Sequence, residues 1–173
     1  VLHGTEMEIR ADGMLDYPDD VLSELDFVIA SLHTGLGQPR EQVMTRILNA
    51  IHNPHVDMIA HPAGRLLPDR AGADLDMDVV FAAAVQTGTI LEVNAHPARL
   101  DLRDTHVRRA LEMGVRVAIN TDAHRPEEFA NRAYGVATAQ RGWATAADVV
   151  NTWPADELLA FIRAKDERAS RPA

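Results

Sequence analysis

Residues 115–124, VRVAINTDAH, join an apolar run rich in β-branched residues to a polar end that carries Asp122 and His124. β-Branched residues favour strands, and a nearly continuous apolar run suits a strand that is covered on both faces. Gly114 precedes the run, at the position where a helix C-cap is expected. The segment therefore predicts a helix that ends near Gly114, a buried parallel strand, and a polar loop at the carboxyl end of that strand.

Four further apolar runs of the same kind precede this segment. Their cores lie at residues 7–9, with an extension back to Val1, and at residues 27–32, 56–60 and 89–93. Helical stretches separate them: residues 40–53 place Val43, Ile47, Leu48 and Ile51 on one stripe, residues 76–87 show the same period, and residues 104–113 form a third predicted helix. Strands that alternate with helices in this way are typical of βα units around a parallel sheet.

The C-terminal third of the chain is predicted to be helical. Helices are expected over residues 126–132, 145–150 and 154–165, with Thr145 as an N-cap and with Pro126 and Pro154 at first helical positions. Residues 1–165 then form one domain, and residues 166–173 are expected to be a frayed tail.

Five parallel strands with outer helices suit either an open α/β sheet or part of a barrel. A complete barrel of eight βα units usually needs about 250 residues, more than the 173 of this chain. The chain also begins almost inside its first strand. The prediction is an α/β chain that forms part of a larger barrel.

Composition restricts the chemistry and the setting. The chain has no cysteine, so any metal must be held by imidazole and carboxylate groups, which suit Zn, Mn and Fe. The net charge of −9 argues against the broad basic face that nucleic-acid binding usually requires. No membrane span or signal peptide is apparent, so no membrane partner is expected and the predicted setting is cytoplasmic.

Residues of types that can bind metals occur where the predicted strands end or begin. They are Glu6 in the first strand, His33 after the second, His61 after the third, and Asp122 and His124 after the fifth; the fourth strand ends with Asn94 and His96. In parallel α/β folds the working residues gather at the carboxyl edge of the sheet. These side chains are therefore expected to lie close together.

A divalent-metal site explains these positions better than packing does. A lone histidine at a strand end is usually a hydrogen-bonded structural residue, and His33 or His61 alone would be read in that way. Three histidines and two carboxylates at corresponding positions would each need a separate partner if they were buried. Asp122 and His124 lie two residues apart, so on an extended segment they would point the same way. Imidazole and carboxylate ligands of this kind favour metal-assisted hydrolysis.

The motifs resemble those of the PHP (polymerase and histidinol phosphatase) superfamily. The motifs that carry the resemblance are Gly4-Thr5-Glu6, Ser31-Leu32-His33, His61-Pro62 with Gly64-Arg65, Glu92-Val93-Asn94 through Arg99-Leu100-Asp101, and Asn120-Thr121-Asp122-Ala123-His124. The likeness is strongest to the PHP domain attached to bacterial family X DNA polymerases and to its free-standing relatives, and it runs from about Leu2 to Arg163.

This resemblance implies a distorted (βα)7 TIM-like barrel with up to three divalent metal ions, Mn, Zn or Fe, that hydrolyses phosphoesters. Glu6 would bridge two metals, His33 and His61 would bind one of them, and Asp122 and His124 would complete the cluster. The metal ligands Asp122 and His124 would thus also be catalytic. Arg65 and Arg99 become candidates for gripping phosphate, with Asn94 and His96 as further substrate contacts.

The family's His-x-His motif, with the aspartate and histidine that follow it, has no counterpart before Glu6. The barrel is therefore expected to be incomplete at the N-terminus, with a first strand that could support self-association. Two functions stay open: a metal-dependent phosphoesterase, and a catalytically silent or truncated PHP module that binds metal in part and has a structural or docking role. The substrate is either a phosphorylated small molecule, which the acidic charge favours, or the 3′ end of DNA, which the polymerase-type motifs favour.

Overall fold

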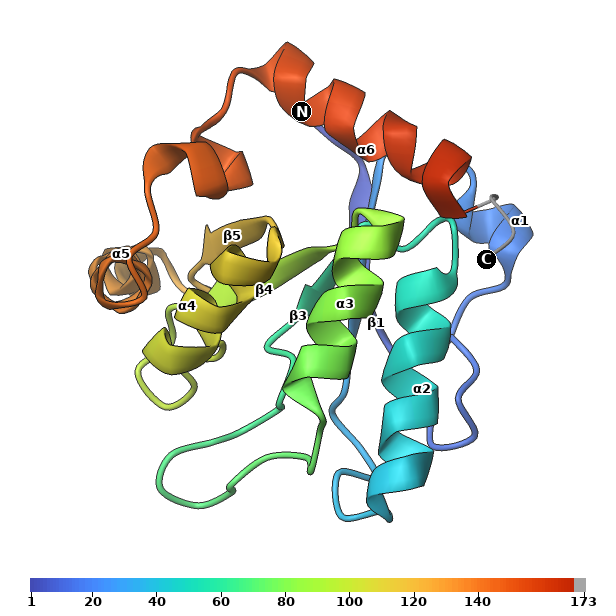
Figure 1. The fold of residues 1–173 in the computed structure, drawn as a ribbon, viewed down its shortest axis with the longest axis horizontal. Helices are drawn as coiled ribbons and strands as arrows, with labels where there is room; N and C mark the ends of the chain where they lie inside the picture. The colour runs from blue at the N-terminus through green and yellow to red at the C-terminus, as the bar shows by residue number, and fades with distance from the viewer. Residues whose placement is uncertain (170–173) are drawn as a thin grey trace.

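A computed structural model describes residues 1–169 of the chain and shows five parallel strands with helices packed around them (Figure 1). The strands are β1 (Gly4–Glu8), β2 (Phe27–Ser31), β3 (Met58–Ala60), β4 (Ile90–Asn94) and β5 (Val117–Asn120). They lie side by side in sequence order. All five predicted strands are therefore present, and the alternation of strand and helix is confirmed as a parallel α/β sheet.

The pairing register brings the carboxyl ends of neighbouring strands to one edge. Glu8 pairs with Ser31, Ser31 with Ala60, and Asn94 with Asn120. Residues that directly follow these positions, such as His33 and His61, are thereby held at the same edge as the polar end of β5.

Three long helices connect the strands and lie on one side of the sheet in Figure 1: α2 (Arg40–His52), α3 (Met77–Thr87) and α4 (Asp104–Met113). Their apolar stripes and the facing strand residues form the main core, with Val43 and Ile47 from α2, Phe81 from α3 and Val107 from α4 fully buried. The helix ends follow the sequence signals, because Asp76 caps α3 by accepting from the Val79 amide, and Gly88 and Gly114 end α3 and α4 with φ of 78° and 95°.

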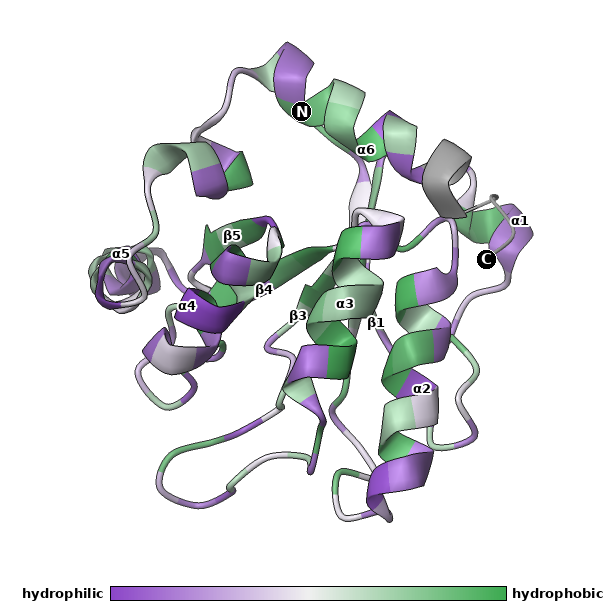
Figure 2. Ribbon diagram, viewed as in Figure 1, coloured by the Kyte–Doolittle hydropathy of each residue, from purple (hydrophilic) through white to green (hydrophobic). Residues whose placement is uncertain are grey.

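A second, smaller cluster packs on another part of the sheet. It joins Met58, Ile90, Ala118 and Val150 to the half-buried Trp153, Leu158 and Phe161. Trp153 lies just before α6 (Ala155–Ala169), and Leu158 and Phe161 belong to this helix. Helix α6 therefore covers a part of the sheet that the other helices do not. Figure 2 shows β3 in the green of apolar residues, as expected for a strand buried between such layers.

A buried lysine fastens α6 to the sheet. Lys165 is 1% exposed, and its Nζ donates to the carbonyls of Ile51 and Val56 and, at 2.8 Å, to the Thr89 hydroxyl. These acceptors belong to the end of α2 and to the segments that lead into β3 and β4. The helix is therefore tied to the end of the sheet opposite the polar edge.

The C-terminal third differs from the expectation in detail. Residues Pro126–Asn131 form a 3-10 helix that leads into α5 (Arg132–Arg141), a helix that the sequence did not predict beyond residue 132. Thr145 is the N-cap, as predicted, and forms the capping box of the 3-10 helix Ala146–Asp148; a second 3-10 helix spans Val150–Thr152. α6 continues to Ala169, past the expected end at Lys165, and residues 170–173 of the expected tail lie outside the described residues.

The sheet is open within residues 1–169, because β1 pairs only with β2 and β5, apart from a single bridge to Val149, pairs only with β4. Strands in unbroken sequence order are typical of a barrel, whereas a doubly wound sheet reverses direction at a switch point. The closed barrel of seven units remains a prediction. Among residues 1–169, no helix has both the length and the apolar character needed to cross a membrane.

Candidate metal centre

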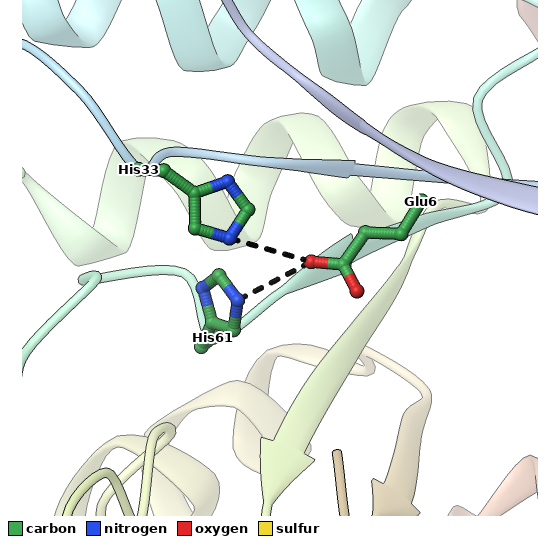
Figure 3. Close-up of side chains that lie close together, drawn as sticks. All are labelled: Glu6, His33 and His61. Atoms are coloured by element: carbon green, nitrogen blue, oxygen red, sulfur yellow. Dashed lines mark ion pairs between the residues drawn. The ribbon is translucent and has the colours of Figure 1, made fainter. Parts of the chain in front are cut away.

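Glu6, His33 and His61 converge at the polar edge of the sheet (Figure 3). Oε1 of Glu6 lies 3.6 Å from Nε2 of His33 and 3.4 Å from Nε2 of His61. One ligand atom from each of the three residues lies within 4.8 Å of the others, a spacing at which a single ion could contact all three. The residues come from β1 and from the loops after β2 and β3, as the sequence predicted.

His61 is the most buried member of this cluster. It is 1% exposed, and neither ring nitrogen has a hydrogen-bond partner among the described residues. Its backbone adopts a positive φ of 29°, and its amide donates to Oε2 of Glu92 at 2.7 Å. A buried imidazole without a partner costs free energy unless something binds it, and an Nε2 that faces a carboxylate suits a shared cation.

Glu6 is held in its ionised form. The close contact with the His61 ring is the main cause that lowers the pKa of the Glu6 carboxyl below its usual range, against the opposing effect of burial. The charges of His61 and His33 lower the pKa further. The carboxylate is therefore negative at neutral pH, as a metal ligand must be.

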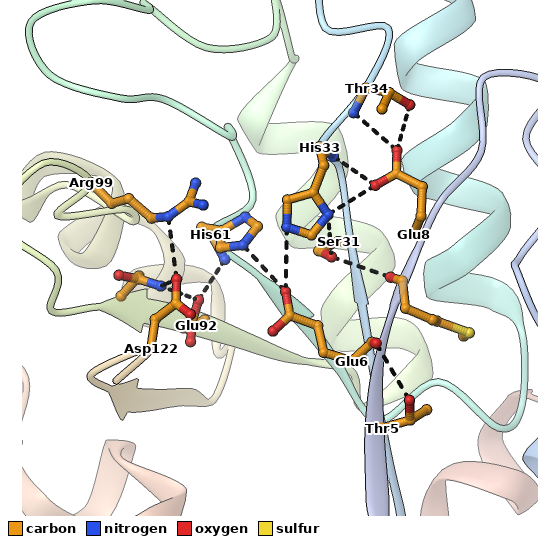
Figure 4. Close-up of polar contacts among 12 residues, drawn as sticks. Thr5, Glu6, Glu8, Ser31, His33, Thr34, His61, Glu92, Arg99 and Asp122 are labelled. Carbon is orange, nitrogen blue, oxygen red and sulfur yellow. Dashed lines mark hydrogen bonds and ion pairs between the residues drawn. The ribbon is translucent and has the colours of Figure 1, made fainter. Parts of the chain in front are cut away.

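Glu8 also belongs to the site, although the sequence did not indicate it as a functional residue (Figure 4). Its carboxylate accepts from the amide and Nδ1 of His33, both at 2.9 Å, and from the amide and hydroxyl of Thr34 at 3.0 and 2.7 Å. Burial raises the pKa of Glu8, but these hydrogen bonds outweigh burial and lower it overall. The strand alternation that places Glu6 and Glu8 on the same side of β1 was the available signal.

Glu92 is a buried carboxylate that holds residues around the site through hydrogen bonds. This carboxylate in β4 is 4% exposed and accepts from the His61 amide and from the side-chain amides of Asn94 and Asn120, both at 3.1 Å. Burial raises the pKa of Glu92, while the charge of His61 and these hydrogen bonds oppose the rise. Glu92 thus connects β4 with the loop after β3 and with β5.

Asp122 and His124 lie at the same edge but do not join the cluster of Glu6, His33 and His61. Asp122 has a φ of 53°, so the backbone is not extended there, in contrast to the extended segment that the sequence analysis assumed. The His124 side chain is 82% exposed, with Nδ1 2.9 Å from the Asp122 carbonyl oxygen and 3.8 Å from Oδ1 of Asp122. The Asp122 carboxylate instead faces Arg99 and Asn94.

The two predicted phosphate-binding arginines have different surroundings. Arg65 donates from Nε to the Arg99 carbonyl at 2.6 Å and from its guanidinium to the Leu100 carbonyl, so it is engaged in holding a loop. Arg99 has its Nε 3.4 Å from Oδ2 of Asp122, and one of its terminal nitrogens is buried without a hydrogen-bond partner among residues 1–169. Arg99 is therefore the better placed of the two to bind an anion beside the site.

Asn94 and His96 are engaged within the protein. The Asn94 side chain is buried and donates to Glu92 and, at 3.3 Å, to Asp122, while its oxygen accepts from the His96 amide at 2.9 Å. The half-buried His96 accepts from the Ala98 amide through Nδ1 at 3.2 Å. Both residues thus help to shape the loop after β4, which carries Arg99.

Asp101 is a further buried carboxylate in this loop. It is 1% exposed and accepts from the Ala63 amide at 2.9 Å. Burial raises its pKa, opposed by the charges of Arg65 and His61. Asp101 thereby connects the loop after β4 with the loop after His61.

A cavity of about 280 Å³ adjoins the cluster. Its wall includes the carboxylates of Glu6, Glu92 and Asp122 and an apolar side formed by Phe27, Met58 and Leu158. The cavity thus combines acidic residues of the candidate site with apolar residues of the sheet and of α6.

Two imidazoles and a carboxylate fit a divalent ion such as Zn, Mn or Fe. The unpartnered nitrogens of His61 supply an independent reason to expect an ion, because hydrogen bonds within the described residues do not satisfy them. Asp122 and His124, the other two predicted ligands, lie outside this group of three.

Comparison of the sequence with known proteins identifies relatives of this chain. No protein-family model matches the chain. The chain is 47% identical over 166 residues to the DNA polymerase/3'-5' exonuclease PolX of Bacillus subtilis, an alignment that covers 96% of this chain and 29% of that protein.

Two other relatives are named as phosphatases. A probable phosphatase of Caldanaerobacter subterraneus is 37% identical over 134 residues, which cover 72% of this chain and 50% of that protein. A probable phosphatase of Shewanella sp. (strain ANA-3) is 28% identical over 170 residues, with 92% of this chain and 61% of the relative covered. The chain thus spans less than two thirds of the length of each of these relatives.

Proposed function

The chain belongs to the PHP superfamily, and from this membership we propose that the protein is a metal-dependent phosphoesterase. The observation that carries the proposal is the convergence of Glu6, His33 and His61, whose ligand atoms lie within 4.8 Å of one another. The names of the relatives, a polymerase with 3'-5' exonuclease activity and probable phosphatases, support the same class of reaction.

Glu6, His33 and His61 would hold one divalent ion, with Mn, Zn or Fe as candidates. Asp122 and His124 would bind a further ion of a cluster that contains up to three. Divalent ions in such a site lower the pKa of the water that they bind and stabilise charge on the phosphoryl oxygens.

The side chains beside the candidate metal site suit an anionic substrate. Arg99 presents a guanidinium with one unpartnered nitrogen, suited to a phosphate oxygen, while its Nε faces Asp122. Arg65 holds the backbone of residues 99 and 100, so it fixes the position of Arg99. The His124 side chain is 82% exposed, so it is accessible to a second ion and to the substrate.

Two substrate classes are compatible with this site. A phosphorylated small molecule agrees with the net charge of −9 and with the relatives named as phosphatases. The 3′ end of DNA agrees with the relative named as a 3'-5' exonuclease. A salt titration of DNA binding separates them, because several phosphate contacts make the affinity fall steeply as salt rises.

A second candidate function is a PHP module that binds metal without turnover. The observation that favours it is the separation of Asp122 and His124 from the group of three ligands. In that case Glu6, His33 and His61 would serve stability or the docking of a partner domain.

The decisive experiment measures metal content and phosphatase and 3'-5' exonuclease activity in the full-length protein that contains this chain. We expect bound metal and hydrolysis of at least one substrate, and we expect Asp122→Ala or His124→Ala to abolish the hydrolysis. Stoichiometric metal without turnover would favour the silent module. Hydrolysis at an unchanged rate in both variants would contradict the assignment of Asp122 and His124.

A further inference from the structure

The imidazole of His33 is held by a carboxylate on the side opposite the candidate metal position. Its Nδ1 lies 2.9 Å from Oε2 of Glu8, while its Nε2 faces Oε1 of Glu6 at 3.6 Å (Figure 4). The same Oε2 atom accepts from the His33 amide at 2.9 Å. Both the backbone and the ring of His33 are thus fixed by one carboxylate oxygen.

The hydrogen-bond partners determine where the ring proton lies. An ionised carboxylate only accepts hydrogen bonds, so the contact between Glu8 and Nδ1 requires the proton on Nδ1. The other neighbour of Nδ1, the Ser31 hydroxyl at 3.2 Å, donates its own proton to the Met7 carbonyl. Nδ1 is therefore the donor and, in the neutral ring, Nε2 carries the lone pair.

A buried arginine holds the loops around Glu8. Arg46 of α2 is 2% exposed and donates to the carbonyls of Ile9 and Thr34 at 2.5 and 3.0 Å, and to the carbonyl of Gly35 at 3.2 Å. One of its nitrogens lies 3.6 Å from Oε1 of Glu8. Since Ile9 follows β1 and Thr34 follows β2, Arg46 fixes the two segments that bear Glu8 and His33 relative to each other.

His61 lacks this arrangement. Its Nδ1 is buried and has no hydrogen-bond partner within the described residues, whereas Nδ1 of His33 has Glu8. Of the two imidazoles in the cluster, His33 has a carboxylate in contact with Nδ1, whereas His61 has no such contact among the described residues.

From this geometry we infer that Glu8, supported by Arg46, is a positioning residue that holds His33 as the Nδ1–H tautomer and directs the Nε2 lone pair toward the metal. A carboxylate behind a ligating histidine fixes the ring orientation and increases the basicity of the ligand, and its loss typically weakens metal affinity about 10- to 100-fold. The tautomer follows from the contacts of this chain alone, and only the effect on metal affinity rests on the proposed function.

The first test is the tautomer of His33 in the metal-free protein. Nitrogen-15 NMR of labelled histidine at a pH of about 8, where an ordinary imidazole is neutral, distinguishes the two tautomers. A His33→Gln variant assigns the signal among the eight histidines of the chain. We expect Nδ1–H in the unmodified protein and a loss of this preference in Glu8→Gln, because an amide can donate to Nδ1. An Nε2–H ring in the unmodified protein would overturn the inference without any variant.

The second test is the affinity for Zn²⁺, measured by calorimetry with a competing chelator. Glu8→Gln is expected to weaken binding about 10- to 100-fold relative to the unmodified protein. Thr34→Val is the matched control at the same carboxylate, because it removes the 2.7 Å contact to Oε1 and leaves Oε2 on His33. Asp12→Asn is the charge control, because Asp12 is an exposed acid that contacts Arg10 and not His33. Both controls should bind Zn²⁺ within about threefold of the unmodified protein, a margin well inside the loss expected for Glu8→Gln.

The outcomes separate the two proposals. If the unmodified protein binds Zn²⁺ and Glu8→Gln binds it equally well, Glu8 has no positioning role and the metal site stands. If the unmodified protein fails to bind Zn²⁺, the proposed metal site fails, and the inferred effect of Glu8 on affinity fails with it. A variant that loses affinity but keeps the Nδ1–H tautomer would contradict the mechanism inferred for Glu8.

Discussion

Nε2 of His61 lies 3.4 Å from Oε1 of Glu6, yet both ring nitrogens of His61 are buried without a hydrogen-bond partner in the described part of the chain. An unsatisfied buried polar group costs about 1–3 kcal/mol of folding free energy. An ion bound between these two residues would offset that cost. The metal site and the stability of the fold are therefore linked.

Metal binding should stabilise the protein against unfolding. A divalent ion that binds only the folded state at about 100 times its Kd adds about 2.7 kcal/mol to the free energy of unfolding. We expect Zn²⁺ or Mn²⁺ to produce a gain of this size in urea unfolding, and a chelator to reverse it. Glu6→Gln should lose most of the gain, because it removes the carboxylate shared by the two histidines.

The control for this prediction is Glu24→Gln, which changes an exposed carboxylate outside the cluster. It should keep the full stabilisation by metal. An equal gain in Glu6→Gln and in the unmodified protein would show that the ion binds elsewhere.

Arg99→Lys should weaken phosphate binding. Arg99 presents a guanidinium nitrogen without a hydrogen-bond partner beside Asp122, and a lysine cannot reproduce the fork of donors. The loss of one charge-assisted hydrogen bond, about 1.5–3 kcal/mol, corresponds to at least a tenfold weaker affinity for inorganic phosphate in metal-loaded protein. Arg109→Lys is the matched control, because Arg109 pairs with Asp78 on the outer helices. Equal phosphate affinity in the two variants would exclude Arg99 from the anion site.

Acidification should destabilise the fold through His106. Burial, followed by the charges of Arg103 and Arg65, lowers the pKa of His106 from 6.5 to about 4. The unfolded chain therefore binds more protons at this residue between these values, so its contribution to stability is present above pH 6.5 and is lost as the pH falls toward about 4.

The measurement is the free energy of unfolding across this pH range for the unmodified protein and for His106→Gln. The variant should lose less stability on acidification. The raised pKa values of the buried Glu92 and Asp101 act in the opposite direction on stability as the pH falls. Because both proteins contain these two residues, the difference between the proteins isolates His106. Identical pH slopes would contradict the prediction.

Gly135→Ala should destabilise the protein although it lies in a helix, where alanine is normally preferred to glycine by about 1 kcal/mol. A Cβ at Gly135 would lie 2.6 Å from Cγ2 of Ile119 and 2.7 Å from Cβ of Ala95. Overpacking of this kind costs about 1–3 kcal/mol, so the clash outweighs helix propensity. Gly37→Ala is the control, because its Cβ would meet nothing within 4 Å. Thermal unfolding of the two variants tests the difference, and a Gly135→Ala protein as stable as Gly37→Ala would refute it.

Self-association through β1 is a further proposal, because β1 pairs only with β2 in the structure of residues 1–169. An unpaired edge strand presents free backbone donors and acceptors to another chain. We expect sedimentation velocity to detect concentration-dependent dimers, and Thr5→Lys to reduce them by placing a charge on the edge. The same dimer content in Thr5→Lys and in the unmodified protein would exclude this edge as the interface.

The positions of β2 to β5 could be predicted from the sequence because each of these strands lies in a short apolar run, and β4 and β5 also follow a clear helix end. Gly88 and Gly114 mark those ends, and both adopt the positive φ that glycine permits. Helix α5 could not be predicted in the same way. Its residues alternate small and polar types around Gly135, and the reason for that glycine, close contact with Ile119 and Ala95, lies in distant parts of the chain.

The cluster of Glu6, His33 and His61 was predictable because parallel strands bring their carboxyl ends to one edge. The placement of Asp122 and His124 was not, because it depends on the positive φ at Asp122 and on the contacts of that residue with Arg99 and Asn94. The roles of Glu8 and Glu92 also depend on tertiary contacts, since both carboxylates act on residues that are more than twenty positions away.

The loop between His61 and α3 is fixed at both of its ends. His61 is anchored at its amide by Glu92, and α3 begins at Met77 with its own cap at Asp76, so both ends of the intervening loop are fixed independently of its sequence. Substitutions in residues 66–75 are therefore expected to leave the backbone of His61 and the start of α3 in place.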